Sequence, residues 1–418
     1  MKRQFDVIVI GGGPAGIMSA ISAATLGTKV ALFEKNKRLG KKLLMTGGGR
    51  CNVTNNQPVD DLIAHIPGNG RFLYSTFSQW DNQDIMAFFQ ERNIALKEED
   101  HGRIFPVSDK SKTIVSALED ELVALGVDLN FQTPVAKLIH NGEQLMGVRT
   151  EEEDVSAKSI IIATGGLTYP STGATGDGYQ FAKTVGHHIT PLYPTESPIN
   201  LDEDFIKDKT LQGLSLRDVR LSVMDEKNKE VTAHEMDLLF THFGLSGPAA
   251  LRCSGFVNQL LKTQQRVSLK LDCFPSLSKE ELLKDLLERI ENSSKSLKNS
   301  LSTLLPERLL TYFLNQLNLG RVSAAQVKKQ QLLDLIGLCK NWNLVAKSTF
   351  GLERSFVTGG GIDLKEIDPK TMSSKKNTGL FFAGEVMDIH GYTGGFNITA
   401  ALCTGHVAGT HAAYHAFS

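Results

Sequence analysis

Residues 5–35 read FDVIVIGGGPAGIMSAISAATLGTKVALFEK, and this stretch decides the fold of the chain. The run at 5–10 is apolar, rich in β-branched residues and too short for a typical helix, which predicts a buried parallel strand. An alanine-rich stretch at 17–26 has the composition of a helix, and a second apolar run at 29–33 stops at Glu34. Strand, glycine turn, helix, strand and acidic residue follow one another directly, so the predicted fold class is α/β with a parallel sheet.

Three glycines after the first strand, Gly11, Gly13 and Gly16, occupy the places of a G-x-G-x-x-G pattern. In a Rossmann-like unit one such glycine makes the tight turn, one lets the backbone approach a pyrophosphate, and one lets helix and strand pack closely. The phosphates then lie against the positive end of the helix, and Glu34 can accept hydrogen bonds from a ribose. The alternative is a tight turn without a ligand, but the helix and the acid fall where dinucleotide binding needs them.

Composition limits the class of protein. A chain of 418 residues with 41% hydrophobic and 22% charged residues is typical of a soluble protein of two or three domains. The net charge of -1 gives no electrostatic reason to expect nucleic acid or an anionic membrane as a partner. No apolar stretch reaches the roughly 18 residues that span a bilayer, and the N-terminal apolar residues belong to the first strand rather than to a signal peptide.

The cysteines point to a reducing compartment. They are odd in number, widely spaced and without a C-x-x-C pair: Cys51, Cys253, Cys273, Cys339 and Cys403. This pattern predicts neither a disulfide framework nor a zinc site, so we expect no metal and a cytoplasmic location.

The chain is expected to leave the nucleotide-binding domain and return to it. Residues 1–190 and 346–418 carry the strand and glycine patterns of that domain. Prolines mark the exit near 191, and short strands in 191–275 predict an inserted β subdomain. Residues 276–345 read as helices with a capping box at the first of them, and their leucine stripes favour a small helical core over a partner surface.

Further glycine clusters bring backbone to the ligand. The segment at 45–52 reads MTGGGRCN, and the strand at 159–166 ends in Thr164 and Gly165. Near the C-terminus, Gly384 and Glu385 end a strand, and a glycine-led helix begins near Gly395. An acid for the ribityl hydroxyls and a helix N-terminus for the negative charge of a reduced ring suit a flavin better than a bare nicotinamide dinucleotide.

No second G-x-G-x-x-G unit follows a strand, because the glycines at 173–178 have the wrong spacing. A dedicated NADPH domain is therefore not expected. Electrons are expected to come from a small substrate or a transiently docked NAD(P)H, and to leave to another acceptor or to dioxygen.

The whole chain resembles the bacterial aminoacetone-oxidase-like flavoproteins (the BaiN/YhiN type). The resemblance rests on the glycine motif with Glu34 and Lys35, on MTGGGRCN, on THFGLSGP at 241–248, on TGGG at 358–361, and on the GE and GGFN strings near the C-terminus. It implies FAD, a split Rossmann-like domain, an inserted β-barrel-like subdomain and a small helical subdomain. It also implies redox chemistry on small organic molecules, with NAD(P)H as a donor in some members.

The resemblance also assigns site residues, matched position by position. It implies that Ala15, Glu34 and Lys35 meet the ADP half and that the backbone of Val135 contacts adenine. It implies that the pyrophosphate and flavin are lined by Lys42, Thr46, Gly48, Gly49, Arg50, Cys51 and Asn52. It implies that Glu385, Asn397 and Ile398 close on the ribityl chain and ring. Phe396 stands where similar sequences often have tyrosine, which removes one hydroxyl.

Catalytic residues are less defined by the sequence. His242 lies in the THFGLSGP string and is the candidate for proton transfer, with a turn histidine as the alternative. His101, Arg103 and His390 have no catalytic spacing, and Cys51 reads as a packing residue rather than a nucleophile.

We therefore expect a cytoplasmic FAD-dependent oxidoreductase that transfers a hydride between flavin N5 and a small amine-like, aminoketone-like or unsaturated substrate. The expected place is the mouth between the nucleotide domain and the insertion. Two alternatives remain at this point: an NAD(P)H-dependent reductase of an unsaturated ring, and an FAD-bound protein associated with RNA. No nucleic acid or membrane partner is expected from the charge, and the oligomeric state is not indicated.

Overall fold

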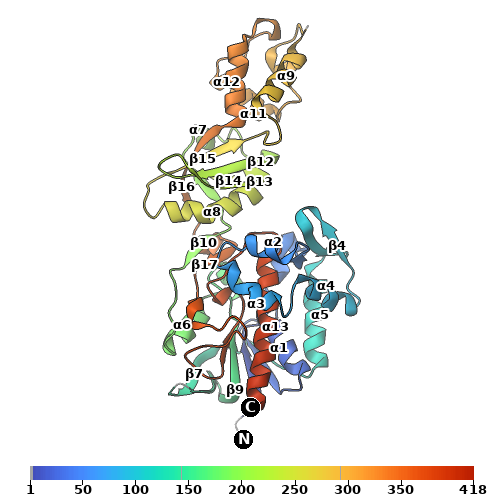
Figure 1. Cartoon of the computed structure of the whole chain (residues 1–418), viewed down its shortest axis with the longest axis vertical. Helices are drawn as coiled ribbons and strands as arrows, with labels where there is room; N and C mark the ends of the chain where they lie inside the picture. The colour runs from blue at the N-terminus through green and yellow to red at the C-terminus, as the bar shows by residue number, and fades with distance from the viewer. Residues whose placement is uncertain (1–2, 143, 292) are drawn as a thin grey trace. The chain divides into compact units, whose positions relative to one another are not determined.

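The computed structural model describes residues 3–142, 144–291 and 293–418 (Figure 1). These residues form two compact units. The first unit comprises the chain up to Pro194 together with Leu352–Ser418, and the second comprises Thr195–Gly351. Within the described residues, no helix combines the length and the hydropathy needed to cross a bilayer.

A parallel sheet forms the centre of the first unit. Its five parallel strands are β6 (Asp128–Phe131), β2 (Val30–Glu34), β1 (Gln4–Ile10), β9 (Asp154–Ile162) and β18 (Leu380–Phe382). β1 pairs with both β2 and β9, with Val9 opposite Leu32 on one side and Ile161 on the other. The antiparallel strands β8 (Gln144–Thr150) and β7 (Val135–Asn141) extend from β9. The predicted α/β class and the predicted opening strands are confirmed.

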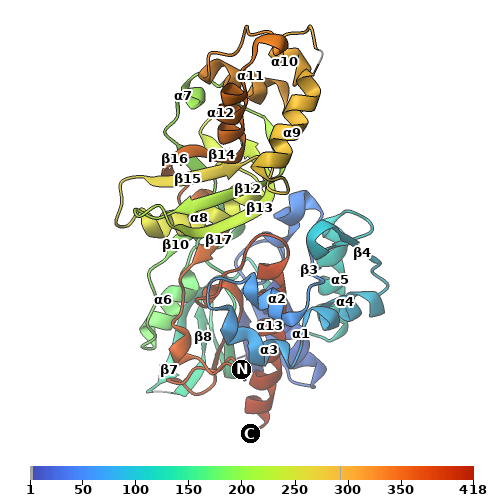
Figure 2. The same cartoon turned by 45° about the horizontal axis from the view of Figure 1, so that its top comes forward.

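The two ends of the chain meet on this sheet. β18 pairs in parallel with β9, so the C-terminal segment rejoins the domain that the N-terminus begins. The first helix, α1 (Pro14–Thr25), lies beside the last, α13 (Phe396–Phe417), in both views (Figures 1 and 2). The helices can approach this closely because Gly405 has no side chain: a Cβ there would lie only 2.4 Å from the Ala15 carbonyl oxygen. A Cβ on Gly409 would lie 2.2 Å from that of Ser19.

The rest of the first unit surrounds the sheet. The helix α5 (Ser111–Ala124) also packs on α1. A small antiparallel sheet has the order β3 (Thr54–Asn55), β5 (Arg103–Pro106) and β4 (Leu96–Glu99). Of the nearby helices, α4 (Asn82–Glu91) contacts this sheet, whereas α2 (Val59–Ala64) contacts α3 (Tyr74–Phe77). α6 (Asp177–Thr184) follows β9. α6 begins at Asp177, inside the glycine-rich segment at 173–178.

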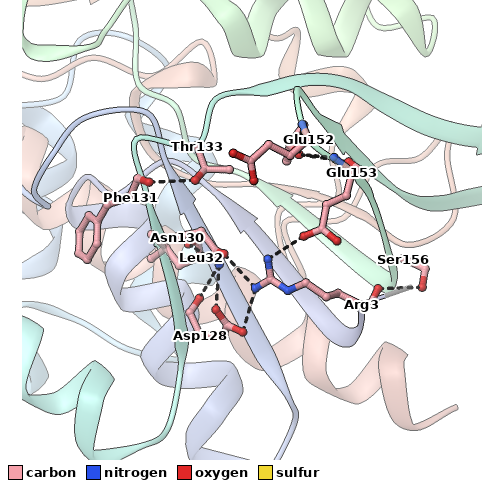
Figure 3. A network of polar contacts seen from close by, with 10 residues as sticks. Arg3, Leu32, Asp128, Asn130, Phe131, Thr133, Glu152, Glu153 and Ser156 are labelled. Atoms are coloured by element: carbon pink, nitrogen blue, oxygen red, sulfur yellow. Dashed lines mark hydrogen bonds and ion pairs between the residues drawn. The ribbon is translucent and has the colours of Figure 1, made fainter. Parts of the chain in front are cut away.

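One arginine ties the N-terminal end of the sheet together (Figure 3). The Arg3 guanidinium donates to Asp128 (2.9 Å) and Asn130 (2.9 Å) on β6, and to Glu153 (3.0 Å) in the turn before β9. Glu153 lies in the hairpin turn between β8 and β9, and its side chain is partly exposed. Its carboxylate is an ion-pair partner of Arg3, a residue 150 positions away that local sequence could not indicate.

The second unit is built around a closed antiparallel barrel. Its strands follow the order β11 (Ile199–Leu201), β14 (Gly244–Ser246), β13 (Glu230–Phe240), β12 (Ser215–Met224), β15 (Val267–Asp272) and β16 (Trp342–Thr349). The sequence assigned residues up to 345 to helices, whereas β16 begins at Trp342 and completes the barrel. The helix α8 (Pro248–Leu260) was also missed, because the whole region read as short strands.

Helices of the second unit share a core with the barrel. They are α9 (Lys279–Ile290), α10 (Leu297–Ser300), α11 (Glu307–Gln316) and α12 (Lys329–Lys340). The predicted capping box is present, since the Ser278 N–H donates to Glu281 (2.8 Å) and the Glu281 N–H donates to the Ser278 hydroxyl (3.2 Å). Leu282 and Leu286 are fully buried in that core, which supports the packing interpretation of the leucine stripes.

Candidate functional site

The turn between β1 and α1 separates glycines needed for packing from a glycine that faces open space. A Cβ on Gly11 would lie 2.5 Å from the Ala163 carbonyl oxygen, and one on Gly16 would lie 1.9 Å from that of Gly11. A Cβ on Gly13 would meet no protein atom within 4 Å. Gly13 is the N-cap of α1, so the free N–H groups of that helix begin at this open position. An anion placed there would find both hydrogen-bond donors and a favourable helix dipole.

Glu34 ends β2 beside this turn and is nearly buried. Its Oε2 accepts from the Gly12 N–H (2.7 Å), and its Oε1 accepts from the Asn36 N–H (2.7 Å). The carboxylate thus supports the glycine turn. Because a carboxylate has about four acceptor positions, it also keeps capacity for a ribose hydroxyl. Lys35 forms an ion pair with Asp177 (2.6 Å), which connects the end of β2 to α6.

The second glycine cluster forms a short turn, η1 (Leu43–Gly49), with another open face. Gly48 and Gly49 have positive φ values of 68° and 89°, and a Cβ on either would meet no protein atom within 4 Å. The Thr46 hydroxyl donates to the Leu43 carbonyl oxygen (2.7 Å) and so stiffens the turn.

Cys51 follows this turn and is fully buried. Burial raises the pKa of its thiol to about 12, so the thiol stays protonated at neutral pH. This supports the packing interpretation over a nucleophilic one.

Lys42 and Glu385 form the central charged pair of the site. The Lys42 ammonium lies 3.0 Å from Glu385 Oε2 and 2.7 Å from the Thr168 hydroxyl. Glu385 Oε1 also accepts from the Thr358 N–H (2.9 Å). The pair joins residues that are 343 positions apart, which supports the expectation that both ends of the chain build one site.

The Arg50 side chain has protein partners. Its guanidinium donates to Glu99 (2.8 Å) and contacts Asp109 (3.4 Å), while it lies 4.1 Å from the centre of the Phe105 ring. The hydrogen bond from Arg50 helps to hold the pKa of Glu99 below its usual value. Any contribution of Arg50 to the pyrophosphate or flavin stays a prediction.

The N-terminus of α13 is shaped by a closed loop. Gly395 is its N-cap with φ of +100°, and a Cβ there would lie 2.6 Å from the Thr54 carbonyl oxygen. The Asn397 side chain accepts from the Gly391 N–H (2.7 Å) and donates to the carbonyl oxygens of Gly391 (2.8 Å) and Tyr392 (3.2 Å).

Phe396 is buried and stacks on His65, with ring centres 4.7 Å apart. The Phe396 ring is therefore a packing group. Ile398, which follows in the first turn of α13, is half-buried.

Two orphaned polar atoms provide a test of whether FAD fits. Asn52 Oδ1 and Thr164 Oγ1 are buried without a hydrogen-bond partner among the described residues. Asn52 Oδ1 lies 3.1 Å from where a Cβ on Gly395 would stand, and Thr164 follows β9 and precedes Gly165. Buried polar groups are normally satisfied, so these unpaired atoms, in the same unit as the open backbone at Gly13, Gly48 and Gly49, indicate a polar ligand. The residues present fit a flavin dinucleotide.

A model of the family described as "HI0933-like protein Rossmann domain" matches residues 5–411. The chain belongs to this HI0933-like family. The BaiN/YhiN-type family expected from the motifs is thereby confirmed, and with it an FAD-dependent oxidoreductase on a Rossmann domain.

Two relatives of this HI0933-like chain align with it over almost its whole length. A protein named ribosomal RNA dihydrouridine synthase from Haemophilus influenzae is 32% identical over 402 residues, which are 95% of this chain and 96% of the relative. A protein named 3-dehydro-bile acid delta(4,6)-reductase from Clostridium scindens is 27% identical over 411 residues, which are 97% of this chain and 98% of the relative.

Among solved structures, 3-ketosteroid delta1-dehydrogenase from Sterolibacterium denitrificans matches with a TM-score of 0.52 and 14% identity. The match covers 99% of this chain and 100% of that one. At that identity the likeness shows a shared fold.

His242 of this HI0933-like protein lies in the second unit, in the turn before β14, and it is exposed. Its ring contacts Phe243, with ring centres 5.0 Å apart. The surrounding THFGLSGP string has structural reasons for its residues: Thr241 Oγ1 accepts from the Gly244 N–H (3.1 Å), and a Cβ on Gly244 would lie 2.1 Å from the Ile199 carbonyl oxygen. A proton-transfer role for His242 stays a prediction, as does the contact of Val135 with adenine.

Sequence reasoning missed Thr168 and Thr358, the hydroxyl and backbone partners of the Lys42–Glu385 pair. The available signal was their position beside glycines: Thr168 ends GGLT at 165–168, and Thr358 begins TGGG at 358–361. It also gave little weight to His390, whose Nδ1 is buried without a partner and whose pKa burial lowers to about 4. His390 is therefore neutral at pH 7.

Proposed function

We propose that this chain is an FAD-dependent reductase that saturates a carbon–carbon double bond conjugated to a carbonyl group in a flat ring. NAD(P)H is the proposed electron donor. The first candidate substrate is a uracil base in ribosomal RNA. The second candidate is a free unsaturated ring compound.

The observation that carries the proposal is chemical agreement between two full-length relatives with different substrates. Dihydrouridine differs from uridine by two hydrogens across a double bond conjugated to a carbonyl. A delta(4,6)-reductase acting on a 3-dehydro compound likewise saturates double bonds conjugated to a carbonyl. The relatives at 32% and 27% identity thus share one reaction type on two ring systems. This favours the reductase alternative over amine oxidation.

The reaction balances with the proposed donor. NAD(P)H gives up a hydride and becomes NAD(P)⁺, one carbon of the double bond gains that hydride, and the other gains a proton from solvent or from an acidic group. When bound, FAD supplies the hydride transfer between donor and substrate. The chain's own residues hold and orient the reactants: the N-terminus of α1 binds phosphate, and Lys42 fixes the Glu385 carboxylate.

The choice between RNA and a free compound depends on local recognition. The net charge of -1 gives no general attraction to RNA, so an RNA substrate would be recognised by local contacts rather than by bulk charge. The same charge is the observation that favours the small-molecule candidate.

The test is an anaerobic two-step experiment on the FAD-loaded protein. NADPH, NADH and aminoacetone are first compared as reductants by the loss of flavin absorbance. The reduced protein is then mixed with a uridine-containing ribosomal RNA fragment or with a 4,6-dien-3-one steroid, and flavin re-oxidation is followed.

We expect reduction by a nicotinamide and re-oxidation by one of the two rings. Fast reduction by aminoacetone with none by NADPH or NADH would contradict the proposal. A reduced flavin that neither ring re-oxidises would contradict it as well.

A further inference from the structure

Two aromatic side chains form an exposed pair in the first unit. The rings of Tyr169 and Phe356 have centres 5.6 Å apart and are inclined by 45°. Phe356 is 42% exposed, and Tyr169 is half-buried. Exposed aromatic surface in contact with a second aromatic ring is a common recognition surface for flat apolar groups.

The pair is held by two segments that are far apart in sequence. The Thr168 hydroxyl donates to the Phe356 carbonyl oxygen (3.2 Å), and the Leu167 N–H donates to the Thr358 hydroxyl (2.9 Å). Thr168 and Thr358 are fully buried. The backbone beside each ring is therefore held by a part-buried hydrogen bond to the other segment, which keeps the two rings next to each other.

The same two threonines connect the pair to the charged centre of the site. Thr168 Oγ1 lies 2.7 Å from the Lys42 ammonium, and the Thr358 N–H donates to Glu385 (2.9 Å). Tyr169 directly follows the first of these threonines, and Phe356 is two residues before the second. The rings are thus tied through one residue on each segment to the groups expected to hold the flavin end of the cofactor.

Tyr169 also has an unfavourable backbone conformation. Its φ of +53° is in the left-handed region, which is unfavourable for a non-glycine residue. Glycine would remove that strain, and the neighbouring segment already contains Gly165 and Gly166. A bulky aromatic residue in this conformation indicates that the ring itself has a role.

We propose that Tyr169 and Phe356 form the stacking surface that selects the flat, unsaturated ring of the substrate. This inference rests on the proposed function. A ring with conjugated double bonds is planar and stacks over its whole face, whereas the saturated product ring is puckered and loses part of that contact. The pair therefore binds substrate more tightly than product and favours release after reduction.

The test compares four variants: Phe356→Leu, Tyr169→Leu, Tyr169→Phe and the control Tyr414→Leu. Tyr414 is 54% exposed on α13, and its replacement removes a similar surface ring. Binding to the oxidised FAD-loaded protein is measured without any electron donor, so no turnover is needed. The probes are a uridine-containing RNA fragment, the same fragment with dihydrouridine in place of the uridine, and a 4,6-dien-3-one steroid. FAD content and the rate of flavin reduction by NADPH are measured in parallel.

We expect each leucine variant of the pair to bind the unsaturated probe about tenfold more weakly, a change of about 1.4 kcal/mol that is typical of the loss of one stacked ring. Tyr169→Phe and Tyr414→Leu should bind like the wild type, and FAD content should not change. The wild type should prefer the uridine fragment or the steroid to the dihydrouridine fragment, and the leucine variants should lose that preference.

Unchanged affinity in both leucine variants would overturn the stacking surface, as would absence of binding of every probe to the wild type. The two proposals can also fail separately. If the leucine variants bind the unsaturated probe more weakly but the NADPH-treated wild type reduces no probe, the proposed function is refuted and the stacking surface is still supported. The RNA and steroid arms separate the two sources of the flat ring.

Discussion

Replacing Gly13 with valine should abolish FAD binding while leaving the fold intact. Gly13 has φ of -83° and ψ of 179°, a conformation that any residue adopts, and a Cβ there would meet no protein atom within 4 Å. The substitution should therefore cost the fold only the N-cap preference of α1, which is about 1 kcal/mol or less of unfolding free energy. The new side chain instead fills the open space at the start of α1.

The loss in FAD binding free energy should be larger than this loss in folding stability. A pyrophosphate at the α1 N-terminus accepts charge-assisted hydrogen bonds, each worth about 1.5–3 kcal/mol. Displacing it from two such donors costs about 3–6 kcal/mol, which corresponds to a loss in FAD affinity of at least about 100-fold. Titration of the FAD-free protein with FAD, followed by flavin fluorescence, measures this loss directly.

Two matched variants separate ligand loss from misfolding. Gly337→Val places the same side chain in open space on α12 of the second unit and should change neither FAD affinity nor the denaturation midpoint measurably. Gly16→Val would put a Cβ 1.9 Å from the Gly11 carbonyl oxygen and should destabilise the fold itself. Wild-type FAD affinity in Gly13→Val would refute the assignment of this turn to the pyrophosphate.

Three further predictions concern other parts of the site. Burial lowers the folded-state pKa of His390 to about 4, while the unfolded pKa is about 6.5, so the unfolded chain binds more protons between these values. The stability that neutral His390 gives the folded chain is therefore lost as pH falls below about 6.5, and it should account for about 2 kcal/mol of the decrease in unfolding free energy between pH 7 and pH 5. In denaturant unfolding, the free energy of His390→Gln should fall by about 2 kcal/mol less than that of the wild type between these pH values. An equal decrease in both proteins would refute the burial argument. The Cys51 thiol should resist thiol reagents at pH 8 until the protein is unfolded, and Cys51→Ala should retain FAD; rapid labelling of Cys51 in the native protein would contradict its burial. Asn397→Asp keeps the acceptor for the Gly391 N–H but loses the hydrogen bonds donated to the carbonyl oxygens of Gly391 and Tyr392, so FAD should bind about tenfold more weakly in titration. An unchanged affinity would show that the loop before α13 does not depend on this side chain.

Sequence alone was sufficient for the parts of the fold that local pattern dictates. The β1–α1–β2 unit, β18 and the start of α13 follow from short apolar runs, glycine turns and an acidic strand end, all within about 30 residues of one another at each end. The capping box of α9 was predictable for the same reason.

Elements that depend on long-range pairing were harder to predict. β16 is a barrel strand because it pairs with β15 and β11. Its residues follow α12 almost directly, so the local sequence does not mark where the strand begins. α12 begins at Lys329, and the residues just before it, Ser323–Gln326, form a separate short turn. Short strands and turns carry too little pattern to outweigh such tertiary effects.

In the candidate site, glycine patterns located backbone with open faces at Gly13, Gly48 and Gly49, but side-chain partners could not be assigned in advance. Arg50 pairs with Glu99 from β4, and Lys42 pairs with Glu385 near the C-terminus. Tyr169 and Phe356 meet across 187 positions. Such pairs exist only after the fold has formed, and no local spacing indicates them.

The most direct test of the account is the flavin stoichiometry of the purified full-length protein. FAD-free protein incubated with excess FAD and then desalted should be yellow, with about one FAD per chain by absorbance. Gly13→Val prepared in the same way should be colourless while still folded by circular dichroism. A wild-type preparation that remains colourless after this incubation would contradict the claim that both ends of the chain build one FAD site.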